Sequence, residues 1–224
     1  MSGCFFPGRG SWFGWVLLLL LALPLGGQLL EAQHRIPGPP PNLESGVLQA
    51  LNRLRQDPAA WSNSLSAERR YFRGRLFSPP GEIPLQTQEG RSAVEEAIAA
   101  LRSVRTPLEP LLPAAGLARA ARLHVQDTGP RGLLGHEGSN GSNFNQRISR
   151  FGEWSGGISE CISYGDGSGA DIISQLVIDD GVPERGHRKT LLDPRWRVVG
   201  IACGPHTGYH NMCVLDFASE FRPR

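Results

Sequence analysis

The stretch from His136 to His187 constrains this chain most, because it holds four ionisable groups that one fold could bring together. They are His136, Glu160, one of the neighbours Asp179 and Asp180, and His187. Imidazole nitrogens and carboxylate oxygens suit zinc and similar divalent metals, and the same groups serve in acid–base catalysis. Histidines beside glycines are also common as plain surface residues. Spacing alone therefore leaves a metal site, an acid–base site and a polar surface open.

Four motifs narrow the choice. They read HEGSNGSNFNQRISRFG, SECISYG, IDDGVPERGHR and RVVGIACGPHTGYHNMCVLDFA. In this order the chain resembles the CAP superfamily (cysteine-rich secretory, antigen 5 and pathogenesis-related proteins), and it is most similar to the small single-domain SCP-like members of bacterial type. The likeness covers roughly Leu43 to Phe217. It implies an α+β fold, a three-layer α-β-α sandwich of CAP type with a central antiparallel sheet.

The resemblance also implies which side chains line the family's central cleft. Carried over motif by motif, the expected metal-capable set is His136, Glu160, Asp180 and His187, with Asp179 and Glu184 as alternative acids. The acid Glu160 stands where the family has GEN, but here Ser159 replaces the Gly and Cys161 replaces the Asn. Loss of that glycine could alter the backbone beside Glu160.

The start of the chain predicts an export signal. Arg9 precedes an apolar run that contains Leu17 to Leu21, and small residues follow. A retained membrane anchor is the alternative, but Pro24 leaves the run shorter than the ~20 residues of a spanning helix. We expect a signal peptide over 1–32 with cleavage after Gly27 or Ala32, a Pro-rich spacer over 33–42, and a CAP domain over 43–219. The mature protein is then secreted and extracellular.

Charge says little about partners, since the formal net charge is only +2. The densest basic run is Arg69, Arg70, Arg73 and Arg75. This run could make weak contact with a membrane surface through anionic lipid, or with polysaccharide, although a solvated helix end is the plainer interpretation. No interleaved basic and aromatic pattern indicates nucleic acid, so no nucleic-acid partner is expected.

Periodicity and capping residues predict the elements. Helices are expected around 47–54, from Asp57-Pro58 through Leu65, over 90–105, over 117–126, from a Ser142 cap through Phe151, and over 171–180. Strands are expected over 158–164, 197–203 and 211–217, the last two as an antiparallel hairpin folded near Gly208. In the first strand, alternation directs Glu160 and Cys161 to opposite faces.

Three cysteines remain after removal of the signal. The hairpin places Cys203 close to opposite Cys213, and disulfides persist outside the cell, so this pair is predicted to be bridged and Cys161 to be free. Asn140 begins an Asn-Gly-Ser acceptor sequence for glycosylation.

Three further histidines of the expected domain lie outside the metal-capable set. His124 is interpreted as a residue near a helix end, where a partly positive imidazole is favoured by the macrodipole. His206 and His210 fall in the expected hairpin turn and are interpreted as exposed.

Three functions compete. The first is a secreted module whose metal-capable cleft binds a small apolar ligand or an extracellular partner, and the resemblance implies lipid or sterol for some members. The second is a zinc-dependent hydrolase in which Glu160 acts as base toward metal-bound water. The third is a purely structural extracellular domain. The sequence has no GxSxG motif, and Cys161 turns away from Glu160. We therefore favour a binding module over an enzyme, with zinc or another divalent metal as its cofactor.

Overall fold

The computed structural model describes residues 38–40, 42–81 and 84–224. The predicted signal peptide and most of the predicted spacer lie outside these residues. The first elements are α1 (Leu43–Gln56) and α2 (Pro58–Glu68). Asp57 separates them as predicted, because its carboxylate accepts the Ala60 backbone N–H at 2.8 Å and Pro58 occupies the first turn.

The central sheet has the order β4-β6-β7-β5. Its strands are β4 (Leu112–Pro113), β5 (Gly152–Tyr164), β6 (Val198–His206) and β7 (His210–Pro223). The three long strands pair antiparallel, as expected, whereas the two-residue β4 runs parallel to β6. Strands β5 and β7 are longer than predicted because their outer ends pair with each other, with Gly152 opposite Pro223 beyond a bulge between Ser155 and Ile158.

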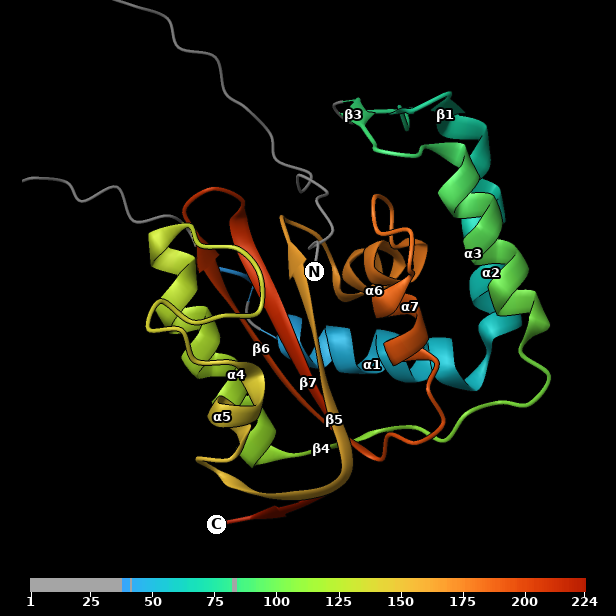
Figure 1. Cartoon of the computed structure of the whole chain (residues 1–224). Coiled ribbons are helices and arrows are strands. Elements are labelled where there is room, and N and C mark those ends of the chain that lie inside the picture. Colours follow the sequence, from blue (N-terminus) through green and yellow to red (C-terminus); the bar gives the residue numbers. More distant parts are fainter. Residues whose placement is uncertain (1–37, 41, 82–83) are drawn as a thin grey trace, which may run out of the picture.

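Helices cover both faces of this sheet and confirm the three-layer α+β sandwich (Figure 1). The helices α4 (Ala115–Thr128) and α5 (Phe144–Ile148) lie on one face, and α1, α6 (Gly169–Ile178) and α7 (Gly186–Leu191) lie on the other. A Cβ on Gly200 of β6 would lie 2.0 Å from the backbone nitrogen of Ala118, so α4 can rest on β6 only because this residue is glycine.

The largest core lies between the sheet and the α1/α6 layer. From α1 it takes residues at the helical spacing read from the sequence, including the fully buried Val47, Leu51 and Leu54. Burial of each such side chain contributes about 1.5–3 kcal/mol. None of the helices in the described ranges is long and apolar enough to cross a bilayer.

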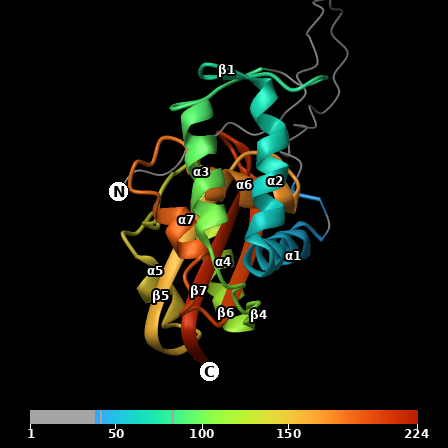
Figure 2. The same ribbon diagram turned by 90° about the vertical axis from the view of Figure 1, so that its right-hand side faces the viewer.

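A helical arm stands beside the sandwich. It consists of α2 and α3 (Arg91–Ser103), which lie side by side in both views, and of a small sheet at their outer end (Figures 1 and 2). This sheet is built from β1 (Phe72–Arg73), β2 (Leu76–Phe77) and β3 (Leu85–Gln86), paired antiparallel. It was not predicted, because strands of two residues leave no periodic signal.

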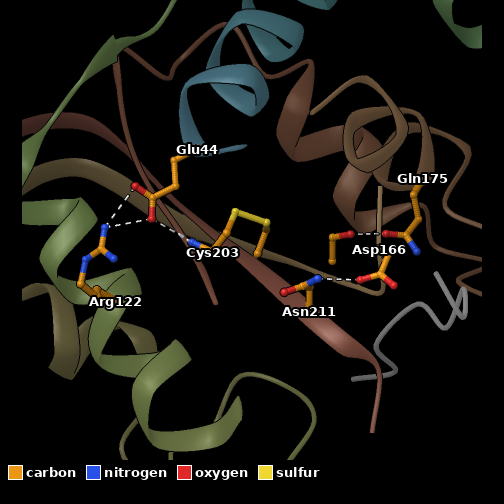
Figure 3. Close-up of a disulfide and its surroundings, with 8 residues drawn as sticks. Glu44, Arg122, Asp166, Gln175, Cys203 and Asn211 are labelled. Carbon is orange, nitrogen blue, oxygen red and sulfur yellow. Dashed lines mark hydrogen bonds and ion pairs between the residues drawn. A yellow bond between two sulfur atoms is a disulfide. The ribbon is translucent and has the colours of Figure 1, made fainter. Parts of the chain in front are cut away.

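The hairpin of β6 and β7 carries the predicted disulfide. Cys203 pairs directly with Cys213, with an S–S distance of 2.01 Å, and Cys161 is free and buried. Beside the bridge, the Cys203 backbone N–H donates to Glu44 of α1 at 3.1 Å, and Glu44 pairs with Arg122 of α4 at 2.9 Å (Figure 3). Glu44 thus ties both helical layers to the hairpin.

Two local predictions were wrong. Asn143, not Ser142, caps α5, through a reciprocal capping box with Gln146, and the helix ends at Ile148 because the chain then turns into β5. His206, predicted to be exposed, is fully buried, and its Nε2 lies 3.1 Å from the Leu133 carbonyl oxygen. His210 is exposed as predicted.

Candidate functional site

His136 and Glu160 form the first pair of the predicted set. Nδ1 of His136 lies 2.8 Å from Oε1 of Glu160, which extends from β5 toward the α4/α5 layer. Arg147 of α5 holds the other oxygen, with Nη2 at 2.7 Å from Oε2. The same guanidinium donates to the backbone carbonyls of His136 and Ser142 at 3.0 and 2.9 Å. One buried arginine therefore fixes both the acid and the loop that carries the histidine.

This arrangement determines how the pair is protonated. Burial by itself would raise the pKa of the Glu160 carboxyl, but the hydrogen bond from His136 and the positive charge of Arg147 outweigh burial and hold that pKa below its ordinary value. Glu160 is thus ionised and can only accept. It follows that Nδ1 of His136 carries a proton and donates, which leaves Nε2 as the nitrogen available to a ligand.

A second acid lies directly behind the pair. Asp216 of β7 is the cross-strand partner of Glu160 and is fully buried. Directly opposed residues of paired strands point to the same face, so the two carboxyls are neighbours. Burial and the negative charge of Glu160 raise the pKa of Asp216 well above its ordinary value. Asp216 therefore holds its proton to a higher pH than an ordinary aspartate does. Sequence reasoning missed it because it lies inside an apolar strand.

The loop before His136 is tied down at Gly135. His124 donates from Nε2 to the Gly135 carbonyl at 2.9 Å, and the Tyr164 hydroxyl accepts the Gly135 N–H at 2.8 Å. Burial lowers the pKa of His124, which keeps it neutral. The interpretation of His124 as a helix-end residue was wrong, because α4 runs on to Thr128 and buries this side chain completely.

Asp179 and His187 form the second pair. Asp179 ends α6 in a left-handed conformation, with φ of 58°. Its Oδ1 lies 2.7 Å from Nδ1 of His187, and its Oδ2 accepts the backbone N–H groups of His187 and Arg188 at 2.9 and 3.3 Å. Both side chains are buried or nearly so. The second imidazole is thus oriented through Nδ1 by a carboxylate, as the first one is.

The choice of Asp180 as the acid beside His187 was wrong, and the alternative Asp179 has that place. The Asp180 carboxylate instead accepts the backbone N–H groups of Gln88, Glu89 and Gly90 at 2.6 to 3.2 Å. These groups lie at the start of α3, where a negative charge is favoured by the helix dipole. Glu184 is exposed.

An ion-pair cluster joins the arm to the segment that carries His187. Arg185 pairs with Glu89 at 2.6 Å and with Glu96 of α3 at 2.7 Å, and Arg188 pairs with Glu96 at 2.8 Å. These bonds raise the pKa of Arg185 above its ordinary value. The position of His187 therefore depends on α3 as well as on α6.

The two pairs flank the edge strand β5. Glu160 faces the α4/α5 layer, whereas its neighbour Ser159 faces α7, where its hydroxyl lies 3.1 Å from that of Thr190. Cys161 is buried in the core against α1 and α6, on the face opposite to Glu160, as the predicted alternation requires. Within the described ranges no three His, Cys, Asp or Glu side chains gather into a group that could hold a metal ion. The candidate donors lie instead as two separate histidine–carboxylate pairs.

Asn140 lies in the loop between His136 and α5. Its side chain is exposed, and its Oδ1 accepts the Ser142 N–H at 3.0 Å. Glycosylation at Asn140 stays a prediction.

Comparisons with known proteins identify the family. Residues 48–217 match the model of CAP, the cysteine-rich secretory protein family. Among solved structures, an extracellular SCP-domain protein from Bacillus anthracis is 17% identical with a TM-score of 0.42, covering 56% of this chain and 40% of its own. An outer surface protein from Borrelia burgdorferi is 16% identical with a TM-score of 0.41, and the match covers 58% of this chain and 89% of that protein. A comparison with curated proteins gives no match. On the family match, which spans most of its length, the chain belongs to the cysteine-rich secretory protein (CAP) family.

Proposed function

We propose that this protein is a secreted binding module in which His136 and His187 contact a ligand or an extracellular partner. One observation carries the proposal: each imidazole is held at Nδ1 by a carboxylate, at 2.8 Å for His136 and 2.7 Å for His187. In the described part of the chain, neither Nε2 has a hydrogen-bond partner. Two oriented rings, each with one nitrogen free, are suited to recognition.

By its ligand chemistry, zinc would suit these donors only as an optional, weakly held occupant shared between the two separate histidine–carboxylate pairs. Metal-binding histidines characteristically donate their second N–H to a carboxylate, as both do here. Because Glu160 and Asp179 serve in that orienting role, the ligands would be Nε2 of His136 and of His187. Two protein ligands are fewer than the three of catalytic zinc sites and the four of structural ones. When bound, zinc would offer open positions to an anionic or polar group of a ligand.

The chemistry of Glu160 favours a binder over a hydrolase. A general base works best with a pKa near the working pH. Glu160 is held by Arg147 and His136, which lower its pKa and occupy both of its oxygens. Such a carboxylate is a weak base and serves to position His136.

A small apolar ligand, such as a lipid or sterol, is the class that we favour. Leu133 and Leu134 come directly before the Gly135-His136 turn, and their exposed fractions are 39% and 42%. Exposed leucines beside an oriented imidazole provide an apolar surface with one polar contact, which is the composition of typical small-molecule sites.

The test combines zinc titration by calorimetry with a substrate panel. Wild type should bind zinc weakly, and His136→Ala and His187→Ala should each abolish that binding. His210→Ala is the matched control, since this exposed histidine pairs with Asp166 away from the site. Peptide, ester and phosphodiester substrates should not be turned over with or without zinc. Metal-dependent turnover that disappears in Glu160→Gln would establish the hydrolase instead.

A further inference from the structure

We propose that the outer end of the arm is a docking surface for an anionic lipid bilayer. The arm tip is defined as residues 69–81 and 84–88, which comprise a short 3-10 turn at Arg69–Tyr71 and the strands β1, β2 and β3. It lies at the far end of α2 and α3 from the body of the sandwich (Figures 1 and 2). This surface is separate from the histidine pairs, so the inference does not depend on the function proposed for them.

The charge of the tip is positive and only partly compensated. The stretch 69–88 contains four arginines and one acid, Glu82, a net of +3, and Glu82 lies outside the described residues. Arg69 is neutralised by Glu95 at 3.2 Å. Arg70, Arg73 and Arg75 are exposed, and within the described ranges they form no ion pair. Three uncompensated cations on so small a surface attract anionic headgroups.

Apolar side chains accompany these cations and distinguish a bilayer from a soluble polyanion. Leu76 is 36% exposed on β2, between the turn that carries Arg75 and the buried Phe77. Tyr71 and Phe72 are half-buried and contact Phe77, the first edge-to-face and the second tilted, with ring centroids 6.3 and 4.6 Å away. Tyrosine and arginine beside exposed apolar residues are typical of surfaces that sit at the headgroup boundary. A polyanion would use the charges but not Leu76.

Contacts within the tip hold two of these cations in place. Arg70 extends over the Tyr71 ring, with its guanidinium carbon 4.8 Å from the centroid, and donates to the Tyr71 hydroxyl at 2.7 Å. Arg75 donates to the Thr87 carbonyl at 3.1 Å, across the small sheet. Arg70 and Arg75 are therefore anchored on the tip rather than on a frayed helix end.

Vesicle sedimentation tests the proposal. The purified protein is mixed with sucrose-loaded vesicles, made either of phosphatidylcholine alone or of phosphatidylcholine with 30 mol% phosphatidylglycerol. All variants carry the same N-terminus as wild type. We expect wild type to favour the anionic vesicles at least tenfold. Each arginine near such a surface is worth about fivefold, so Arg70→Gln/Arg73→Gln should weaken binding by about 30-fold. Arg105→Gln/Arg150→Gln is the control, because it removes the same charge from exposed positions away from the tip.

Leu76→Ser separates a bilayer from a soluble polyanion. It should weaken binding to anionic vesicles severalfold and leave binding to dextran sulfate unchanged. Three results would overturn the proposal: equal binding to neutral and anionic vesicles, an equal loss in the control variant, or a Leu76→Ser variant that binds vesicles as wild type does. The last result, together with tight dextran sulfate binding, would assign the tip to anionic polysaccharide. Circular dichroism of each variant verifies that the fold is retained.

Discussion

Replacement of Arg147 by methionine should destabilise the fold strongly. The guanidinium is 3% exposed and Glu160 is fully covered, so the substitution leaves a buried carboxylate without its main counter-ion. It also removes the bonds to the carbonyls of His136 and Ser142. Removal of one partner from a buried ion pair costs about 3–5 kcal/mol. For a domain of this size that corresponds to a fall in Tm of about 6–20 °C.

The loss should depend on pH in a definite direction. In wild type the folded pKa of Glu160 is depressed, so its contribution is present above the unfolded pKa of about 4.3 and is lost as pH falls through the folded value. Without Arg147, burial raises this pKa and Glu160 can become neutral on mild acidification. The difference in free energy of unfolding between wild type and Arg147→Met should therefore be largest at pH 7 and shrink toward pH 4.5.

Urea unfolding followed by tryptophan fluorescence measures both effects. The double variant Arg147→Met/Glu160→Leu is the decisive companion, because an apolar pair of similar volume removes the uncompensated charge. It should be more stable than Arg147→Met alone. A loss below about 1 kcal/mol in the single variant, or additive losses in the double variant, would refute the account of this pair.

Three further outcomes follow. Cys203→Ala/Cys213→Ala should lower the free energy of unfolding by about 2–3 kcal/mol, as expected for a bridge across 10 residues. Non-reducing peptide mapping of wild type should find this pair linked and Cys161 free. Folded Asp216 retains a proton that the unfolded chain releases above pH ~3.9, so Asp216 makes wild type less stable as pH rises. Asp216→Asn should remove that loss, so its free energy of unfolding relative to wild type should be higher at pH 8 than at pH 4.5. An equal difference at the two pH values would contradict this account. Asp180→Ala should cost about 1.5–3 kcal/mol, because it removes the hydrogen bonds to the segment that leads into α3. It should leave zinc binding unchanged, whereas lost zinc binding would restore Asp180 as a ligand.

The sequence predicted the fold best where its patterns are periodic. Alternation in β5 placed Glu160 and Cys161 on opposite faces, and hairpin spacing paired Cys203 with Cys213. The ordered motifs identified the family, which the match over residues 48–217 confirms. These predictions succeeded because strand alternation and antiparallel register are local rules with little tertiary dependence.

The predictions that failed depended on single backbone angles or on distant contacts. The left-handed turn at Asp179 directs its carboxylate to His187 and the carboxylate of Asp180 to the segment before α3. No feature of the neighbouring sequence distinguishes these two aspartates. The role of Arg147 was not predicted, because its partner lies 13 positions away on a strand. His124 offered a usable signal, since it shares the apolar face of α4 with Leu117 and Ala121 at seven- and three-residue spacing.

The central claim is that both site histidines are held at Nδ1 by a carboxylate and offer Nε2 to a ligand. Long-range ¹H–¹⁵N spectra of the imidazole nitrogens, assigned with His136→Ala and His187→Ala, test it most directly. At pH 7.5 both rings should carry their proton on Nδ1, and zinc should shift the two Nε2 resonances while the Nδ1 protons persist. Protonation at Nε2 in either ring before zinc, or a zinc response confined to other histidines, would contradict the account.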